Sequence, residues 1–351
     1  MKKFSTFLSC ALVCAGVFSS CEKQKALPVS PEPEMAELSI RLEGVDADIS
    51  TKASTTANGT DKTISSAQIF VYNPAGTLVG KLSSGGRLSV PKGFVYTVQA
   101  VANGPVIANP TITSVEATAV NLQDYPFIMY KKTTVSLVNA ATAACTLKVE
   151  SLASRVRVAS IKNEIPGWTG SFTLQSVFLC NVVGTAKIGG APQPISLNWY
   201  GRKVLTTPVS AGGGGAVDET VPAGTYTVKS LGSPLASGAS YTSNIWLYCF
   251  PNANKTPIPA AGITSTAADQ TVATWLTIRA IINDKNYFWT VNLGEKITAT
   301  TGLKANYTYD VSVTLRNIGS ENPSIPVVPG SLDISVIAEP WKNGGDITQV
   351  I

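Results

Sequence analysis

A cysteine near the start of the sequence is the residue whose surroundings specify its chemistry most closely. Lys2 and Lys3 precede an apolar run, Phe4–Phe18, and two serines then lead into Cys21. A short basic start, an apolar segment and small residues at its end form the layout of a secretory signal. Where a cysteine follows at once, the bacterial lipoprotein pathway diacylates its thiol and removes the signal. The pattern predicts a signal peptide over residues 1–20 and a lipid anchor on Cys21; an ordinary signal that happens to hold a cysteine is the alternative.

The chain has no histidine, and this limits the reactions that it could catalyse. Nucleophile activation by Ser-His-Asp or Cys-His arrangements is excluded, as are histidine-containing zinc sites. The glycine run Gly212–Gly215 is not followed by the lysine and hydroxyl residue of a phosphate-binding loop. Asp46 and Asp48 lack the spacing of a calcium-binding EF-hand loop. We predict no catalytic residues, no metal and no cofactor, with a paired-carboxylate hydrolase as a remaining alternative.

Three further cysteines, Cys145, Cys180 and Cys249, lie inside apolar, strand-like stretches. An odd number of cysteines cannot pair completely within one chain, and none of the three has the close spacing of a metal-binding pair. The sequence favours buried free thiols, and it leaves open one disulfide whose pairing the spacing does not define.

The composition favours β-structure and argues against a nucleic-acid partner. Only 14% of the residues are charged; 27 basic residues against 22 acidic ones give a net charge of +5, and the basic residues are scattered. A nucleic-acid-binding protein gathers such residues into a patch or stripe. Threonine and valine are frequent, and 29 glycines and 21 prolines interrupt the chain, which is typical of many short strands and turns. We therefore expect an all-β protein.

Strand-like segments follow one another at a spacing of about 8–12 residues, which indicates β-sandwiches. A polar stretch with several prolines, 21–36, is predicted to be a lipidated flexible tether. The turn at Pro166-Gly167 is the best candidate boundary. We expect two β-sandwich domains in tandem, of a transthyretin-like or Greek-key type: an N-terminal domain over 37–165 and a C-terminal domain over 166–351.

The first and last strands alternate apolar and polar residues, so each has one face to bury. The alternating apolar residues are Leu38, Ile40 and Leu42 in the first strand, 37–45, and Leu332, Ile334, Val336 and Ala338 in the last strand, 331–339. A polar loop, 46–62, separates the first strand from the body. Removal of the first strand would leave a groove with unpaired backbone groups, which the last strand of another subunit could fill. The alternative is that both strands complete their own sandwiches.

Several short motifs follow one another along nearly the whole chain. They are Ser19-Ser20-Cys21, Thr51–Ala53, Ile64, Ile69–Tyr72 with Gly76 and Leu78-Val79, Tyr96–Asn103, Leu152–Val156, Asn306–Tyr309, and Val336 with Trp341. Their order resembles that of the fimbrillins, the type V pilins of Bacteroidetes. In this resemblance Leu152–Val156 is the segment that closes the N-terminal domain.

The resemblance implies how the chain would mature and assemble. It implies export as a lipoprotein to the cell outer membrane, exposure at the cell surface, and cleavage after the first strand by a trypsin-like surface protease. An arginine precedes the cut in the best-known members; here Lys52 stands at the matching place, before Ala53, with Lys62 and Arg41 as rivals. Cutting would free the body to polymerise with other copies or related subunits into a fimbrium that supports adhesion.

A surface lipoprotein that does not polymerise is the alternative function. An anchor or tip subunit would share much of the sequence, whereas a module that binds a glycan or a host protein would need an aromatic platform. The candidates for such a platform are Trp199-Tyr200 and Trp246 with Tyr248, although a sandwich core explains these residues at least as well.

Overall fold

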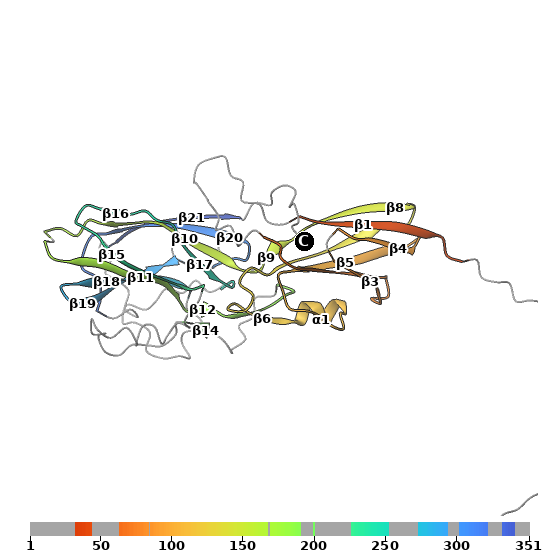
Figure 1. Ribbon diagram of the computed structural model, residues 1–351, viewed down its shortest axis with the longest axis horizontal. Helices are drawn as coiled ribbons and strands as arrows, with labels where there is room; N and C mark the ends of the chain where they lie inside the picture. Colours follow the sequence, from red (N-terminus) through yellow and green to blue (C-terminus); the bar gives the residue numbers. More distant parts are fainter. Residues whose placement is uncertain are drawn as a thin grey trace, which may run out of the picture. The chain divides into compact units, whose positions relative to one another are not determined.

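Alternating apolar residues organise most of the described chain into short strands (Figure 1). The computed structural model describes residues 32–43, 63–83, 85–167, 169–190, 199–200, 226–252, 273–293, 302–321 and 332–340. Residues Met35–Ile351 form one compact unit, and Met1–Glu34 form another. All of the strands described below belong to the Met35–Ile351 unit.

Eight strands from the first half of the chain form two sheets around one core. They are β1 (Met35–Glu43), β2 (Ala67–Tyr72), β3 (Leu78–Leu82), β4 (Arg87–Pro91), β5 (Val95–Ala102), β7 (Met129–Ser136), β8 (Thr142–Lys148) and β9 (Glu150–Ser151). One sheet has the order β4-β1-β8 and the other the order β3-β2-β5-β7-β9. Both sheets contribute to one cluster of buried apolar side chains, among them Leu38, Val71 and Val98. The two sheets therefore form a β-sandwich.

Nine strands from Ser154 onward form two further sheets. They are β10 (Ser154–Asn163), β11 (Phe172–Cys180), β15 (Val228–Pro234), β16 (Ser240–Tyr241), β17 (Ile245–Cys249), β18 (Trp275–Ile282), β19 (Lys285–Asn292), β20 (Tyr307–Leu315) and β21 (Leu332–Pro340). One sheet has the order β16-β10-β20-β21, with β17 also paired to β10, and the other has the order β15-β11-β18-β19. Both sheets contribute side chains to a second buried cluster, among them Val156, Ile278 and Val311.

A short helix covers the second face of the β2-β5-β7 sheet (Figure 1). This helix, α1 (Ile112–Ala117), is followed by β6 (Ala119–Asn121), which pairs with β13 (Thr185–Lys187); β12 (Val182–Val183) pairs with β14 (Trp199–Tyr200). Because one face of β5 meets the sandwich core and the other meets the α1 segment, five consecutive residues at its end are buried. The sequence analysis missed α1, which begins with a capping box between Thr111 and Ser114.

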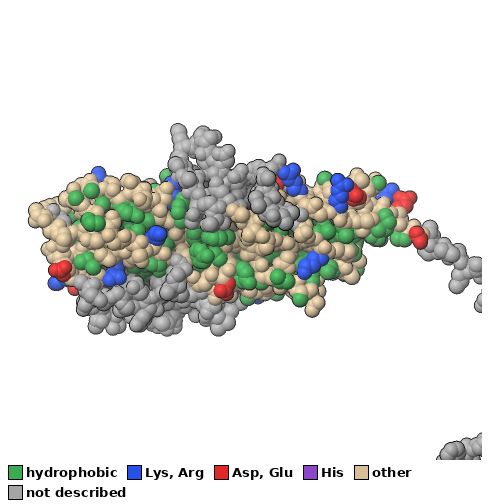
Figure 2. Space-filling model, viewed as in Figure 1, with side chains coloured by type: hydrophobic (Ala, Val, Ile, Leu, Met, Phe, Trp, Pro, Cys, Tyr) green, Lys and Arg blue, Asp and Glu red, His purple; other side chains and the backbone are tan. Residues whose placement is uncertain are grey.

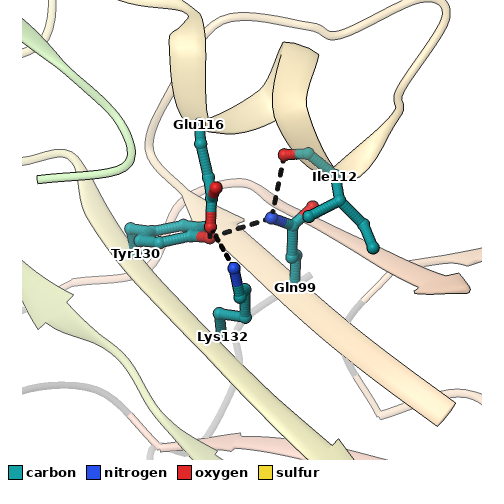
Figure 3. Close-up of polar contacts among 5 residues, drawn as sticks. All are labelled: Gln99, Ile112, Glu116, Tyr130 and Lys132. Atoms are coloured by element: carbon teal, nitrogen blue, oxygen red, sulfur yellow. Dashed lines mark hydrogen bonds and ion pairs between the residues drawn. The ribbon is translucent and has the colours of Figure 1, made fainter. Parts of the chain in front are cut away.

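Polar side chains hold α1 against the sheet (Figure 3). The fully buried Gln99 donates through Nε2 to the Ile112 carbonyl at 3.2 Å and to the Tyr130 hydroxyl at 2.9 Å. Tyr130 donates in turn to Glu116, which also accepts from Lys132 at 2.6 Å. Burial raises the pKa of Glu116, but the hydrogen bonds from Lys132 and Tyr130 outweigh it and leave that pKa below its ordinary value. The cluster thus fixes the helix by a charge-assisted network.

The expectation of an all-β protein built from β-sandwiches is confirmed. The segment Leu152–Val156, expected to close the N-terminal domain, instead leads into β10, which pairs in parallel with β20 and antiparallel with β17. Judged by pairing, the chain enters the second pair of sheets at Ser154 and not at Pro166. The reason is long-range: Val156 and Val158 bury their side chains in the second cluster. The division into two domains stays a prediction.

Candidate strand-exchange site

The first strand is the central strand of its sheet. β1 pairs antiparallel with β4, from Met35 opposite Pro91 to Ser39 opposite Arg87. On its other side it pairs in parallel with β8, from Glu37 opposite Thr142 onward. Removing β1 would therefore leave a groove between β4 and β8, whose backbone N–H and C=O groups along that groove would be unpaired.

The inner face of β1 is apolar along its whole length. The side chains Ala36, Leu38, Ile40 and Leu42 are 3%, 0%, 2% and 5% exposed. They pack on apolar residues of the opposite sheet, which include Ile69, Val71, Val98 and Ala100. Burial of a leucine or isoleucine side chain contributes about 1.5–3 kcal/mol, so the three large residues together hold β1 with roughly 5–9 kcal/mol. The predicted alternation of Leu38, Ile40 and Leu42 is thus confirmed while β1 occupies its place in the sheet.

The outer face of β1 carries two acidic residues that meet basic residues of the flanking strands. Glu37 lies 3.0 Å from Arg87 of β4, and Glu43 lies 3.8 Å from Lys148 of β8. Figure 2 shows basic and acidic side chains close together over the end of the molecule where Figure 1 places these strands. Arg87, Glu37 and Lys148 are 72%, 48% and 58% exposed and Glu43 is 20% exposed, and such surface pairs contribute about 0–1 kcal/mol each. The sequence analysis missed Arg87 and Lys148, because their role depends on which strands are neighbours.

A thiol lies beside the middle of β1, on the neighbouring strand β8. Cys145 of β8 stands opposite Ile40 in the register and is 8% exposed. Both residues line an open pocket of about 570 Å³ together with Ile64 and Arg87. Burial raises the pKa of the Cys145 thiol. Cys145, Cys180 and Cys249 are all free and buried, as predicted from the apolar stretches that contain them.

One asparagine fastens the start of the body after the predicted processing loop. Asn103 has a positive φ of 54° at the end of β5, a conformation that asparagine tolerates better than most residues. Its Oδ1 accepts from the Ser65 and Ser66 amides at 2.8 and 3.3 Å, and its Nδ2 donates to the Thr63 carbonyl at 2.7 Å. The segment ahead of β2 is therefore held to the sheet independently of β1.

The last strand lies at the edge of the other sandwich. All nine residues of β21 pair antiparallel with β20, and no other described strand pairs with β21. Ile334 and Val336 pack against the second core, while Ile337 points outward and is 52% exposed. At its start Asp333 accepts from Arg316 at 2.6 Å in an exposed ion pair.

Only part of the predicted aromatic platform lies among the side chains that the structure describes. Trp246 is covered by the guanidinium groups of Arg155 and Arg157, which lie 4.8 and 5.6 Å from its ring centroid. Tyr248 is 2% exposed and meets Phe127 edge to face. Neither ring is therefore free to stack on a sugar. The side chains of Trp199-Tyr200 in β14 lie outside the described residues.

The predicted modification sites are not visible in the structure. Cys21, Lys52, Ala53 and Lys62 lie outside the described residues, whereas Arg41 lies within β1. Within the described ranges no three His, Cys, Asp or Glu side chains are gathered to hold a metal ion. No helix in the described part of the chain is long and apolar enough to cross a bilayer.

Several solved structures resemble this fold over most of the chain. A candidate cell adhesion protein from Bacteroides eggerthii is 18% identical with a TM-score of 0.61, covering 88% of this chain and 97% of its own. Another, from Parabacteroides distasonis, is 18% identical with a TM-score of 0.58, covering 88% and 100%. A fimbrilin from Porphyromonas gingivalis is 14% identical with a TM-score of 0.57, covering 90% and 99%. No family model and no curated protein matches the sequence. The chain therefore has the β-sandwich fold of the Bacteroidetes fimbrillins.

Proposed function

We propose that this chain is a structural subunit of a cell-surface fimbria that supports adhesion. The observation that carries the proposal is the position of β1. It is the middle strand of a three-stranded sheet, with four alternating side chains buried in the core. β1 also lies between the predicted lipid anchor and the predicted cut, so one cut would break its covalent link to the rest of the chain. The hydrogen bonds of Asn103, which hold the segment ahead of β2, would stay in place.

The chain would mature in two steps. Acylation of Cys21 attaches it to the outer membrane, and more than one acyl chain gives stable anchoring. A trypsin-like surface protease then cuts between Lys52 and Ala53, in a polar segment of the kind that proteases nick. After the cut β1 is held only by its noncovalent contacts, which the three large buried side chains set at roughly 5–9 kcal/mol.

The vacated groove would accept β21 of another subunit. β21 has nine residues, as β1 has, and its sequence shows the same alternation of apolar residues. As an edge strand it gives up hydrogen bonds to only one neighbour when it leaves, and between β4 and β8 it would gain two. A strand donated from each copy to the next is a heterologous contact, which builds an open filament when the rotation between copies does not close a ring. The partners are other copies of this chain or related fimbrial subunits.

The test is to define the N-terminus and the assembly state together. The surface-exposed protein is separated on a non-denaturing gel, and each band is analysed by mass spectrometry. We expect a ladder whose subunits begin at Ala53, and we expect Lys52→Gln to abolish it while the matched control Lys62→Gln does not. A single band that begins at acylated Cys21 under every condition would contradict polymerisation and favour an anchor subunit or a solitary binding lipoprotein.

A further inference from the structure

An open pocket of about 590 Å³ combines aromatic rings with hydrogen-bonding groups. We infer that this pocket binds a neutral pyranose ring of a glycan. Phe127 and Tyr226 form the surface on which the sugar stacks, and the Asp124 carboxylate accepts hydrogen bonds from its hydroxyl groups. The inference does not rest on strand exchange, because none of these residues belongs to β1 or β21.

The pocket lies where segments from both pairs of sheets meet. Ser65 and Ser66 stand just ahead of β2, Asn103 follows β5, and Asp124–Phe127 lead into β7. Tyr226 comes from the second half of the chain, two residues before β15. Small-ligand sites have volumes of about 300–1,000 Å³ and prefer such junctions between packed units. The position and the size of the pocket therefore suit a ligand of one or two sugar rings.

The two aromatic rings that line the pocket are fixed by a third ring. Phe127 and Tyr226 meet edge to face with centroids 5.4 Å apart, and Tyr248 meets them edge to face at 5.1 and 6.2 Å. Tyr248 is 2% exposed, whereas Phe127 and Tyr226 are only partly buried and line the pocket. Rings that are held in advance lose little conformational entropy when a ligand binds. Tyr248, which cannot stack on a sugar itself, thus supports the two rings that can.

The polar groups of the pocket differ in whether they are already engaged. Asn103 directs its side-chain amide to the backbone of the segment before β2, so it shapes the wall of the pocket. The Asp124 side chain is exposed and forms no hydrogen bond or ion pair with any residue that the structure describes. Its backbone is held in place, because the Asp124 amide donates to the Asn121 carbonyl at 3.2 Å. A carboxylate has lone pairs for more than one donor, so it can accept from two neighbouring sugar hydroxyls.

This combination of groups selects a neutral sugar over other ligands. Of the residues that the structure describes, no lysine or arginine lines the pocket, so nothing there compensates a sulfate, a phosphate or an acidic sugar. A purely apolar ligand would cover the Asp124 carboxylate without giving it a hydrogen bond, which is costly. A quaternary ammonium ion would use the rings but offers no donor to the carboxylate. A pyranose has a face of C–H groups and a rim of hydroxyls, and it uses both.

The test is binding of defined monosaccharides to the full chain without its leader. Saturation-transfer NMR is recorded with the methyl glycosides of glucose, galactose, mannose, N-acetylglucosamine and fucose, and with tetramethylammonium as the cation probe. We expect at least one glycoside to bind, with transfer strongest to the C–H protons on one face of its ring, because only that face contacts the aromatic side chains. The cation probe should show no transfer.

Two variants, each with a matched control, place the sugar in this pocket. Asp124→Asn should weaken glycoside binding about 10- to 100-fold, because it removes a charged acceptor. The control Asp284→Asn changes another exposed aspartate, in the turn between β18 and β19, and should leave binding unchanged. Tyr226→Leu should abolish the saturation transfer, whereas Tyr226→Phe keeps the ring and should retain it. An unchanged urea midpoint in each variant shows that the loss is not one of folding.

The contrary outcomes each overturn a defined statement. Absence of transfer to all of the glycosides would overturn the inference. Glycoside binding that survives both Asp124→Asn and Tyr226→Leu would put the sugar elsewhere on the protein and overturn the site. Transfer to tetramethylammonium without transfer to any glycoside would show an aromatic cage for cations and overturn the class of ligand. The proposed function is tested separately by the ladder on the non-denaturing gel, so either can fail without the other.

Discussion

Leu38→Ala is expected to loosen β1 in a chain that has been cut between β1 and β2. Leu38 is fully buried at the centre of the strand. Truncation of a buried leucine to alanine costs about 2–5 kcal/mol, because transfer free energy is lost and a cavity is left. At about 1.4 kcal/mol for each factor of ten, the cut strand should be retained roughly 30- to 4,000-fold more weakly than in the wild-type chain.

The Cys145 thiol provides the assay. It lies on β8 opposite Ile40 of β1 and is 8% exposed while β1 is in place. Departure of β1 uncovers it, so its rate of reaction with a maleimide at fixed pH should rise with the fraction of cut chains that have lost the strand. The measurement is the rate in the cut Leu38→Ala chain against the rate in the cut wild-type chain. Before cutting, the two rates should differ far less, because β1 is still covalently joined to the body and returns to its place between β4 and β8.

Two controls separate strand release from general unfolding. Cys180 and Cys249 are buried in the second pair of sheets, where burial raises the pKa of each thiol to about 12, so they should stay unlabelled. Ser39→Ala removes only the long hydrogen bond of 3.5 Å from the Ser39 hydroxyl to the Ala143 carbonyl, and it should change the rate far less than Leu38→Ala does. If all three thiols react together, or if cutting leaves Cys145 as protected in Leu38→Ala as in the wild type, β1 is an integral part of the fold and not a removable strand.

Three further tests concern the side-chain contacts that stabilise the fold. Asn103→Ala is expected to lower the free energy of unfolding by about 1–2 kcal/mol, because the loop amides and carbonyl that it holds lose their partner; an unchanged urea midpoint would contradict this. Arg157→Ala should cost about 3–5 kcal/mol, since it removes the ion-pair partner of Asp310, whose side chain is only 12% exposed. Arg316→Ala removes exposed pairs with Glu164 and Asp333 and should cost much less; equal losses in urea unfolding would refute the distinction. Burial raises the pKa of Tyr72 and of Tyr309 from 10.0 to about 12. Their contribution to stability is therefore complete below pH 10 and is lost as the pH rises towards 12. Tyrosinate absorbance of these two groups should appear together with unfolding, and their titration near pH 10 in folded protein would count against the assigned burial.

The strands that alternate strongly could be predicted from sequence alone. Leu38, Ile40 and Leu42 face the core as their period of two requires. The helix α1 could not be predicted in this way. It has six residues, of which only Val115 is buried, so it shows no helical period, and its capping box ends in serine where glutamate or glutamine is usual.

The partners of the strands could not be predicted, because pairing depends on choices made across the whole chain. Nothing local to Arg87 or Lys148 shows that β4 and β8 flank β1, and so their charges could not be matched to Glu37 and Glu43. For the same reason nothing local to Leu152–Val156 shows that β10 pairs in parallel with β20. Periodicity defines the faces of a strand, whereas the order of strands in a sheet is set by tertiary packing.

The long separation between paired strands has a consequence for the rate of folding. Ser39 of β1 meets Ala143 of β8 across 104 positions of the sequence, and Arg157 meets Asp310 across 153. Chains rich in such distant contacts have a high contact order and fold slowly, because loop-closure entropy is lost before the contacts form. The sheet that contains β2, β3, β5 and β7 pairs mostly between neighbours in the sequence and can form first. β1 is then expected to dock late, so that every folding chain passes through a state in which its groove is open to a strand from elsewhere.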